Sequence, residues 1–431
     1  MNSEPIRIAV AGLGTVGAGV IKILQESEDA LTTRAGLPVQ VAAVSARSRD
    51  KDRGVDLSSY KWVDDPLDLL QEDNVDVVLE LMGGSEGPAY DLVSKAVAQG
   101  KSVVTANKAL MAHHGFDLAE KAQETGAKIM YEAAVAGGIP IIKLMREGFS
   151  ANEARGVYGI LNGTCNYILT VMRETGRSFE DVLSEAQERG YAEADPAFDI
   201  EGTDAAHKLA LLAALAYGVK PDLDALSTTG ITKVTAHDIA YVDELGYRIK
   251  LLGIVRRMNG SILQVVEPCL VPSQSQIALV EGVFNAVFFE GNFVDKTVSI
   301  GHGAGAGPTA SSVVADIVDL ARGSNVPVFG AGLNHIKDAQ WASPADLESR
   351  FYIRLLVLDK PGVLADISGI MRDHDISMEV VLQRGQNPEN PVDLVIKSHQ
   401  VSRAAIDRAA GVLKEHDAVV EEPVIFRIED I

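Results

Sequence analysis

A glycine motif near the start of the chain constrains the fold more than any other feature. Residues 7–11, RIAVA, read as a buried parallel strand, and Gly12, Gly14 and Gly17 follow directly in the pattern G-x-G-x-x-G. Residues 16–24 then show helical spacing. Between a strand and a helix, the first glycine permits a tight turn, the second lets the backbone approach a pyrophosphate, and the third allows close helix–strand packing. The motif predicts a dinucleotide site at the start of this helix.

Apolar strand-like runs continue after the motif and alternate with helical stretches. The runs lie at 39–45, 75–81, 102–105 and 128–132. This alternation is typical of a doubly wound parallel sheet, so we predict an α/β fold with an N-terminal Rossmann-type dinucleotide-binding domain. Because the chain has 431 residues, further domains must follow.

The residues after the second predicted strand bear on the choice of cofactor. NAD-binding proteins usually carry an acidic residue there, whereas this chain has Arg47 and Arg49. Two arginines favour the 2′-phosphate of NADP, although NAD stays possible, and both could instead lie on a solvated loop of mixed charge. Thr15 and Val16, at the start of the predicted helix, complete the candidate phosphate site.

A lysine follows the predicted strand at 102–105. Thr105 ends that strand, and Lys108 stands three residues later in the segment TANK. Ligands of open parallel sheets bind outside the carboxyl ends of the strands, so Lys108 could reach the nicotinamide. It could equally be a surface lysine at the end of a strand.

An acidic segment, 190–208, leads into a helix that is apolar on every side. Its carboxylates are Glu193, Asp195, Asp199, Glu201 and Asp204. A helix that is apolar all round is buried. Asp204 and Lys208 are four residues apart and therefore share one face of this helix. The pattern predicts a pocket for a ligand with an ammonium group; the alternative is a solvated acidic loop with one structural ion pair.

Two further turns carry candidate ligand groups. In residues 159–167, a strand turns into a helix, and Gly163 and Thr164 would offer N–H groups and a hydroxyl to an anion. In residues 131–140, Glu132 stands beside a Gly-Gly-Ile-Pro turn with free carbonyls. Oxygen ligation of a hard cation is possible there, and a plain crossing loop is as good an interpretation.

Composition excludes several classes of partner. The net charge of −21 disfavours nucleic acid and anionic membranes, and no apolar run approaches the ~20 residues of a membrane-spanning helix. The N-terminal residues have no basic stretch before an apolar core, so we do not expect a signal peptide. The two cysteines, Cys165 and Cys269, form no metal or redox spacing, which suits a reducing cytoplasm.

The C-terminal part reads as a separate module. Residues 351–426 show the order β-α-β-β-α-β, which is ferredoxin-like, after a polar stretch at 343–349. We expect few contacts to cross that stretch, so that removing the chain beyond it leaves a folded, active protein. The predicted domains are 1–142, completed by about 301–340, then 143–300 as a substrate and dimerisation domain, and 350–431.

Several motifs together resemble one family. AGLGTVG, TANK, EAAVAGGIP, NGTCNYI, GHGAGAGPTA and above all GYAEADPAFDIEGTDAAHK are similar to those of homoserine dehydrogenases of the bacterial form with a C-terminal regulatory domain. The resemblance spans nearly the whole chain. It implies an NAD(P)-dependent interconversion of L-homoserine and L-aspartate 4-semialdehyde in threonine, methionine and isoleucine biosynthesis.

The resemblance also implies roles for individual residues. Lys208 and Lys108 resemble an acid–base pair, and Asp204 would orient Lys208 and the substrate. Glu193 and Asp199 would hold the amino end of the substrate, which Tyr191, Gly163 and Thr164 would line. Gly305 and Lys108 would contact the cofactor, and Glu132 with the carbonyls of Val135, Gly137 and Ile139 resembles a site for a monovalent cation such as Na⁺.

With DKPGVL at its first turn, the C-terminal module resembles an ACT domain, a small amino-acid sensor. We expect L-threonine as its effector and a homodimer or homotetramer; the alternative is a dimerisation module without a ligand. Two other functions stay open for the whole chain. One is a thiol-dependent semialdehyde dehydrogenase with Cys165 as nucleophile, and the other is a non-enzymatic amino-acid sensor.

Overall fold

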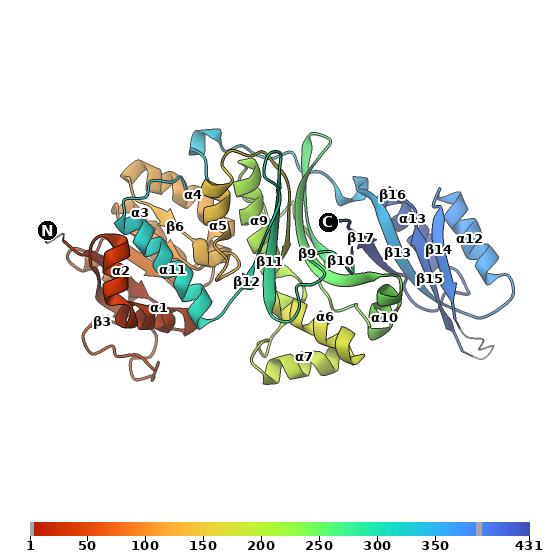
Figure 1. The fold of residues 1–431 in the computed structure, drawn as a ribbon, viewed down its shortest axis with the longest axis horizontal. Helices are drawn as coiled ribbons and strands as arrows, with labels where there is room; N and C mark the ends of the chain where they lie inside the picture. The colour runs from red at the N-terminus through yellow and green to blue at the C-terminus, as the bar shows by residue number, and fades with distance from the viewer. Residues whose placement is uncertain (1–3, 385–389) are drawn as a thin grey trace.

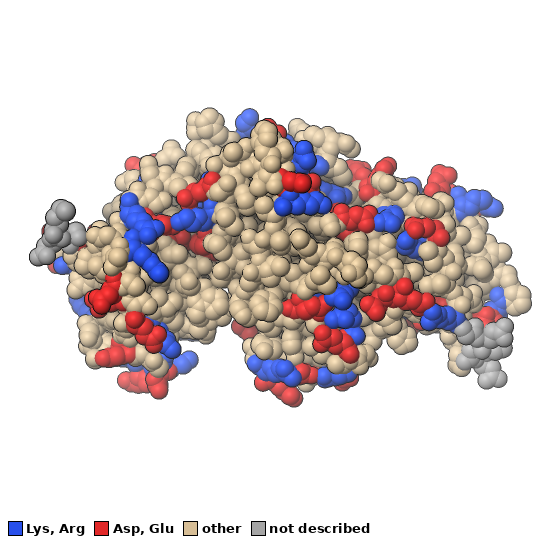
Figure 2. Space-filling model, in the orientation of Figure 1, with Lys and Arg blue, Asp and Glu red and all other residues tan. Residues whose placement is uncertain are grey.

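The computed structural model describes residues 4–384 and 390–431, so the first residues of the expected N-terminal domain lie outside it. The molecule is elongated, with three units following one another along its long axis (Figure 1). On the face drawn in Figure 2, basic side chains lie beside acidic ones and do not form a broad basic patch. No helix within the described residues is long and apolar enough to cross a membrane.

The first unit is built on a six-stranded parallel sheet in the order β3-β2-β1-β4-β5-β6. The strands are β1 Ile6–Ala11, β2 Val39–Ser45, β3 Lys61–Val63, β4 Val77–Glu80, β5 Ser102–Thr105 and β6 Ile129–Met130. The helices are α1 Thr15–Glu26, α2 Glu28–Ala35, α3 Pro88–Ala98 and α4 Lys108–Thr125, with 3-10 turns at Pro66–Gln71 and Glu132–Ala134. The predicted parallel sheet is confirmed, and β3, which is only three residues long, is an addition to it.

A helix from much later in the chain completes this unit. Helix α11, Ala306–Ala321, lies beside α1 in Figure 1. Its apolar side, which includes Val313 and Ile317, belongs to the same buried cluster as Ile8 and Val20. The helices approach closely because Gly19 has no side chain, since a Cβ there would lie 2.6 Å from the carbonyl oxygen of Ala306.

The second unit contributes one end of an eleven-stranded mixed sheet, whose main path is β12-β11-β7-β9-β10-β17-β13-β15-β14. Its own strands are β7 Ala154–Ile160, β8 Ser227–Thr228, β9 Tyr247–Met258, β10 Ser261–Pro272, β11 Phe284–Gly291 and β12 Asp295–His302. Its helices are α5 Ile141–Lys143 followed by a π-helical turn Leu144–Gly148, α6 Gly163–Thr175, α7 Phe179–Glu188, α8 Ala197–Ile200, α9 Thr203–Tyr217 and α10 Ala236–Glu244. Every residue of α9 from Asp204 to Ala214 is buried, as the all-apolar pattern predicts.

The C-terminal unit has the predicted β-α-β-β-α-β order. Its elements are β13 Glu348–Val357, α12 Val363–Asp373, β14 Met378–Gln383, β15 Val392–Ser398, β16 Val401–Ser402, α13 Arg403–Lys414 and β17 Val424–Ile428, after 3-10 turns at Leu333–His335 and Pro344–Asp346. Strand β17 also pairs in parallel with β10 of the second unit, through Cys269 opposite Arg427 and Leu270 opposite Ile428. The two units therefore share one continuous sheet.

The expectation that few contacts cross residues 343–349 is wrong. The carboxylate of Asp238, fully buried at the start of α10, accepts hydrogen bonds from Arg354 Nε at 2.6 Å and from the hydroxyl of Tyr352 at 3.1 Å. The buried Arg427 donates from Nε to Glu267 on β10 at 2.6 Å. The stretch resembled a linker because it is polar and contains a proline, but Leu347 within it is buried, and strands of the second and C-terminal units bond to each other.

Candidate functional site

A cavity of about 690 Å³ lies between the first and second units, at the carboxyl ends of the parallel strands. It collects residues that the sequence placed in separate motifs: Thr15, Val16, Lys108, Gly137, Gly163, Thr164, Tyr191, Glu193, Asp199, Asp204, Lys208 and Gly305. Of the other candidates, Gly12, Gly14, Gly17, Arg47, Thr105, Glu132, Val135 and Ile139 are not part of its lining. The position agrees with the general rule for ligands of open α/β sheets.

At the centre of the cavity, one buried carboxylate is shared by two lysines. Asp204 Oδ1 lies 2.8 Å from Lys108 Nζ, and Asp204 Oδ2 lies 2.7 Å from Lys208 Nζ. Lys108 reaches the carboxylate from the start of α4, whereas Asp204 and Lys208 occupy one face of α9. Burial alone would raise the pKa of Asp204, but the attraction of Lys208 and then Lys108 outweighs it and holds the pKa well below its usual range.

The ammonium group of Lys208 lies between two hydrogen-bond acceptors. Its side chain is buried, and its ammonium donates to Asp204 and, at 2.7 Å, to the carbonyl of Leu161. Burial lowers the pKa of Lys208, and the opposing effect of Asp204 only partly offsets this. Because an ammonium group has three N–H bonds, one is left over for a ligand oxygen in the cavity.

Asn162 joins the two acidic residues of the site. Its Nδ2 donates to Asp199 Oδ1 and to Asp204 Oδ2, both at 2.8 Å, while its Oδ1 accepts from the backbone N–H of Cys165 and caps α6. Asn162 lies within the motif NGTCNYI, but it is not among the site residues predicted from sequence. The signal was present, since Asn directly before a helix is a preferred N-cap.

The acidic wall of the cavity comes from the loop before α9. Asp199 Oδ2 accepts from the Thr164 hydroxyl at 3.2 Å, and this hydroxyl also lies 2.7 Å from the carbonyl of Tyr191. Burial and the neighbouring Asp204 raise the pKa of Asp199. Glu193 and Tyr191 are exposed at the mouth of the cavity. The predicted pocket for an ammonium group is consistent with this arrangement.

The glycine motif forms the cradle that a dinucleotide phosphate needs. Gly12 has φ +98°, and a Cβ there would lie 2.5 Å from the carbonyl oxygen of Leu81. A Cβ on Gly17 would lie 2.0 Å from the carbonyl oxygen of Gly12. At Gly14, which caps α1, a Cβ would meet nothing within 4 Å, so the backbone is open to an approaching group. No acidic residue in the first turn of α1 would repel a pyrophosphate.

Three arginines follow β2, and they differ in their contacts. Arg47 and Arg49 are exposed. Arg53, which is not among the residues predicted from sequence, folds back and donates from Nε to the carbonyl of Leu13 at 3.1 Å, and its guanidinium lies 5.5 Å from the ring centre of Trp62. Arg53 therefore holds this loop against the glycine motif.

Thr105, the last residue of β5, links Glu80 of β4 to the start of α4. Its hydroxyl donates to Glu80 Oε2 at 2.7 Å and accepts from the backbone N–H of Asn107 at 2.9 Å. The side chain of Asn107 in turn caps α4 through the N–H of Leu110 at 3.0 Å. This chain of bonds fixes the first turn of α4, on which Lys108 stands.

Three of the four groups expected to hold a cation, Glu132 and the carbonyls of Gly137 and Ile139, accept hydrogen bonds from the protein. Glu132 accepts from the backbone N–H groups of Ile142 and Lys143, both at 2.8 Å, and burial raises its pKa to about 7. The carbonyl of Gly137 accepts from Ser312 at 2.6 Å, and that of Ile139 from the N–H of Ile141 at 2.7 Å. Across the described residues, no group of three or more His, Cys, Asp or Glu side chains could hold a metal ion. A carbonyl-bound monovalent cation stays a prediction.

Cys165 has the wrong surroundings for a nucleophile. Its side chain is fully buried in α6 and lies 3.2 Å from the carbonyl of Asp199. Burial, and after it the charges of Asp199 and Asp204, raise the pKa of the thiol well above its usual value. Since the thiolate is the reactive form, the site disfavours the thiol-dependent alternative.

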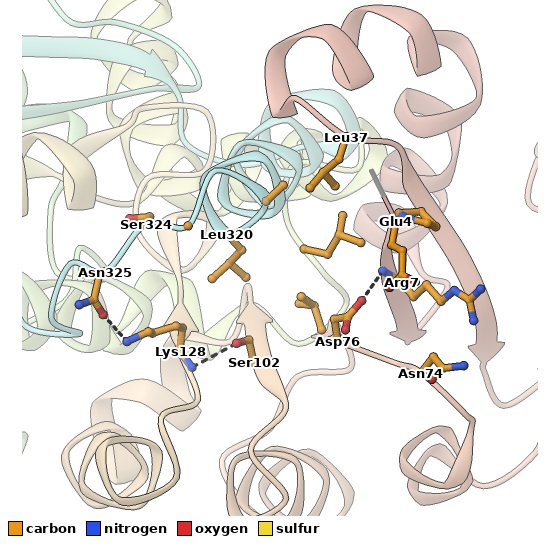
Figure 3. A pocket seen from close by; sticks show the side chains of 15 residues that line it. Glu4, Arg7, Leu37, Asn74, Asp76, Ser102, Lys128, Leu320, Ser324 and Asn325 are labelled. Carbon is orange, nitrogen blue, oxygen red and sulfur yellow. Dashed lines mark hydrogen bonds between the residues drawn. The ribbon is translucent and has the colours of Figure 1, made fainter. Parts of the chain in front are cut away.

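A second cavity, of about 890 Å³, lies at the opposite ends of the parallel strands (Figure 3). It is lined by Arg7 at the start of β1, by Ser102 at the start of β5 and by Lys128, which bonds to Asn325. Its position at the amino ends of the strands is not where ligands of such sheets bind, and none of the predicted site residues lines it.

Comparisons with known proteins agree with this geometry. Residues 12–132 match the family model described as "Homoserine dehydrogenase, NAD binding domain", and residues 140–318 match the model "Homoserine dehydrogenase". The homoserine dehydrogenase of Pseudomonas aeruginosa is 42% identical over 99% of this chain and 100% of that protein. The crystal structure of a homoserine dehydrogenase from Thiobacillus denitrificans superposes with a TM-score of 0.93 at 42% identity, covering 99% of both chains. A hyperthermophilic archaeal homoserine dehydrogenase in complex with NADPH, with a TM-score of 0.64 and 28% identity, covers 74% of this chain and 99% of its own.

Proposed function

Because the chain belongs to the homoserine dehydrogenase family, we propose that its cavity interconverts L-homoserine and L-aspartate 4-semialdehyde with a nicotinamide dinucleotide, in the route to threonine, methionine and isoleucine. The observation that carries this proposal is the arrangement of Lys108, Asp204 and Lys208 in a cavity that also reaches the start of α1. It combines a proton-transferring group with a phosphate-binding turn and an acidic wall.

In the proposed reaction, Lys208 moves the proton and the acidic loop holds the substrate. When bound, the nicotinamide accepts or supplies the hydride at the carbon that carries the oxygen. In homoserine oxidation, neutral Lys208 takes the hydroxyl proton, and its lowered pKa favours this form. In the reverse direction, its ammonium returns the proton to the oxygen. Lys108 lies on the other oxygen of Asp204 and can share this role.

The acidic wall suits a zwitterionic amino-acid substrate. Glu193 and Asp199 would bind the α-ammonium group, with Tyr191 beside them. Gly163 and Thr164, at the start of α6, would offer donors to the α-carboxylate, as helix N-termini do.

We also propose that the enzyme prefers NADP to NAD. This rests on the exposed Arg47 and Arg49 after β2 and on the NADPH bound by the related archaeal homoserine dehydrogenase. We also propose that a monovalent cation such as Na⁺ binds beside Glu132, because a cation would stabilise the ionised form of this buried carboxylate.

For the C-terminal unit we propose an ACT-type sensor with L-threonine as its effector. A cavity of about 350 Å³ lies at the turn after β13 and is lined by Asp359 to Leu364, Gln383 and Leu394. We expect L-threonine, but not D-threonine, to bind at this turn and to lower the activity. Isothermal titration of the full chain would measure it, and Leu364→Glu, at the exposed rim, should weaken binding about tenfold. Unchanged binding in this variant would place the effector elsewhere.

We further propose a homo-oligomer, a homodimer or homotetramer, in the cytoplasm. Phe293, with 80% of its surface exposed, and Ile300, with 54%, lie at the outer end of the sheet around β12, where a second copy could cover them. Both cysteines are free and buried, which agrees with a reducing compartment.

The catalytic proposal is tested by steady-state homoserine oxidation with wild type and Lys208→Ala. We expect the variant to lose ~10²–10⁴-fold in kcat and to bind NADPH with unchanged affinity, measured by fluorescence titration. Lys22→Ala, an exposed lysine on α1, is the matched control and should behave as wild type. If Lys208→Ala keeps more than about a tenth of kcat, the proton passes through another group, with Lys108 the first candidate.

A further inference from the structure

The carbonyl of Leu161, which holds Lys208, has a second donor. Leu161 follows the last residue of β7 and is buried. Its oxygen accepts from Lys208 Nζ at 2.7 Å and also from Asn285 Nδ2 at 3.0 Å. A carbonyl oxygen has two lone pairs, so these two donors use its full capacity.

Asn285 is held tightly in the position that this contact requires. It lies on β11, has only 1% of its surface exposed and lines the cavity. A Cβ on Gly303 would lie 2.1 Å from Asn285 Cγ, so the glycine-rich segment can pass this side chain only as glycine. The orientation of the amide is also fixed, because the opposite orientation would set its oxygen against the Leu161 carbonyl.

The oxygen of the amide has no hydrogen-bond partner among the described residues. This atom, Asn285 Oδ1, is buried. Burying an amide oxygen without a donor costs free energy, so the position calls for an explanation. The nitrogen of the same amide, Nδ2, donates to the carbonyl shared with Lys208.

We propose that Asn285 is a positioning residue that sets the proton affinity of Lys208 through the shared Leu161 carbonyl. The inference rests on the proposed role of Lys208 in catalysis. The donated N–H of Asn285 draws electron density from the carbonyl oxygen and so weakens its bond to the Lys208 ammonium. Without this donor, the same oxygen would stabilise the ammonium more strongly, and Lys208 would hold its proton to higher pH.

Three charged groups also affect the pKa of Lys208. Asp204 on the same helix and Asp199 on α8 favour the ammonium, whereas Lys108 on α4 disfavours it. Asn285 approaches from β11, on the side of the carbonyl, and its amide nitrogen donates to that carbonyl rather than to either carboxylate. Its replacement by an uncharged residue therefore changes the carbonyl contact while the three charges stay in place.

The test compares two variants at this position with a matched control. Asn285→Leu removes the donor at similar size, and Asn285→Asp keeps the shape but replaces the donor with a carboxylate. The control is Gln264→Leu on β10, where another buried amide donates to a single carbonyl, that of Asp222, and also has an oxygen without a partner among the described residues. For each protein, kcat for homoserine oxidation is measured against pH, together with the KM for NADP and the midpoint of thermal unfolding.

On the acid side of the pH profile, kcat falls as Lys208 becomes protonated. We expect the midpoint of this acid limb to move to higher pH by roughly 0.5–1 unit in Asn285→Leu and further in Asn285→Asp. At a pH on that limb, a shift of this size lowers kcat about 3- to 10-fold. The limb of Gln264→Leu should not move, and the KM for NADP should stay within about twofold in all three variants.

An unmoved limb in both Asn285 variants, whatever their kcat, would overturn the proposal and leave Asn285 with a structural role. An equal shift in Gln264→Leu would overturn it as well, because the effect would then follow from general destabilisation. Failure of the underlying function looks different: wild type would not oxidise homoserine, or Lys208→Ala would stay active.

Discussion

At the scale of single residues, Asp204 receives hydrogen bonds and ion pairs from three side chains of the site. Two lysines from different helices meet its two oxygens, and Asn162 adds a third donor. A carboxylate held by so many donors stays ionised at any physiological pH and cannot itself carry the proton. In the proposed reaction, Asp204 therefore orients the lysines and does not itself transfer the proton.

We also expect the choice between NADP and NAD to depend on single residues. Arg47→Ala should raise the KM for NADP about tenfold or more and leave the KM for NAD within about twofold, because only the 2′-phosphate needs the guanidinium. Arg49→Ala, equally exposed on the same loop, is the comparison. Initial rates with each cofactor measure both. A parallel rise in the two KM values for Arg47→Ala would show that this side chain does not meet the 2′-phosphate.

The sequence predicted the residues of the site better than the bonds between them. Asp204 and Lys208 were found as a pair because a helix places residues four apart on one face. The bond from Lys108 to Asp204 joins two helices, and the contact of Asn285 with the Leu161 carbonyl depends on how β11 lies beside β7. No local pattern encodes such contacts, because they arise from strand register and domain packing.

At the scale of elements, a close contact couples β10 to the acidic loop. Thr229 donates from its N–H to Val266 of β10 at 2.7 Å, and Ile231 donates to the carbonyl of Ile200, the last residue of α8, at 2.9 Å. Between them, Gly230 leaves no space for a side chain, since a Cβ would lie 2.1 Å from the Ile200 oxygen. The position of Asp199 on α8 therefore depends on the strand on which this segment rests.

Gly230→Ala should displace α8 and raise the KM for homoserine several-fold, with little change in the KM for NADP. The reason is that the added methyl group meets backbone atoms, which must move together with Asp199. Gly411→Ala, in α13 with open space where the Cβ would lie, is the control and should be neutral or stabilising. Kinetics and thermal unfolding measure both variants. A KM for homoserine unchanged in a folded Gly230→Ala enzyme would contradict this coupling.

Local sequence patterns predicted individual elements better than the pairing of elements that lie far apart in the chain. The strands at 39–45 and 102–105 have the predicted bounds, because each is a short, well-delimited run of strand-forming residues. The pairing of β17 with β10 could not be predicted, since it joins segments far apart in the chain.

At the scale of the whole molecule, the C-terminal unit is part of the central sheet. Ending the chain at Ala342 would leave Asp238 and Glu267 without Arg354 and Arg427 and would uncover the edge of β10. The truncation would also expose apolar residues of a core that Tyr352 and Phe426 share with the second unit, against a typical total stability of only roughly 5–15 kcal/mol. We therefore expect this truncated protein to be insoluble or unfolded, in contrast to the expectation from sequence.

The truncation is judged by soluble yield and size-exclusion chromatography. A chain ending at Pro423, which lacks only β17 and the residues after it, should fail in the same way. A chain ending at Glu429 keeps β17, loses the exposed pair of Arg350 with Asp430, and should behave as wild type. A soluble and active protein ending at Ala342 would show that the junction does not hold the catalytic units together.

The place of β17 also has a consequence for the order in which a newly made chain can fold. Strand β17, which is made after every other described strand, lies inside the sheet, between β10 and β13. The dinucleotide-binding and catalytic units can collapse during synthesis, since domains generally fold as they emerge. The sheet that joins them to the C-terminal unit can close only after β17 has left the ribosome. Until then the part of β10 around Cys269 and Leu270 keeps an unpaired edge, which exposes it to premature association.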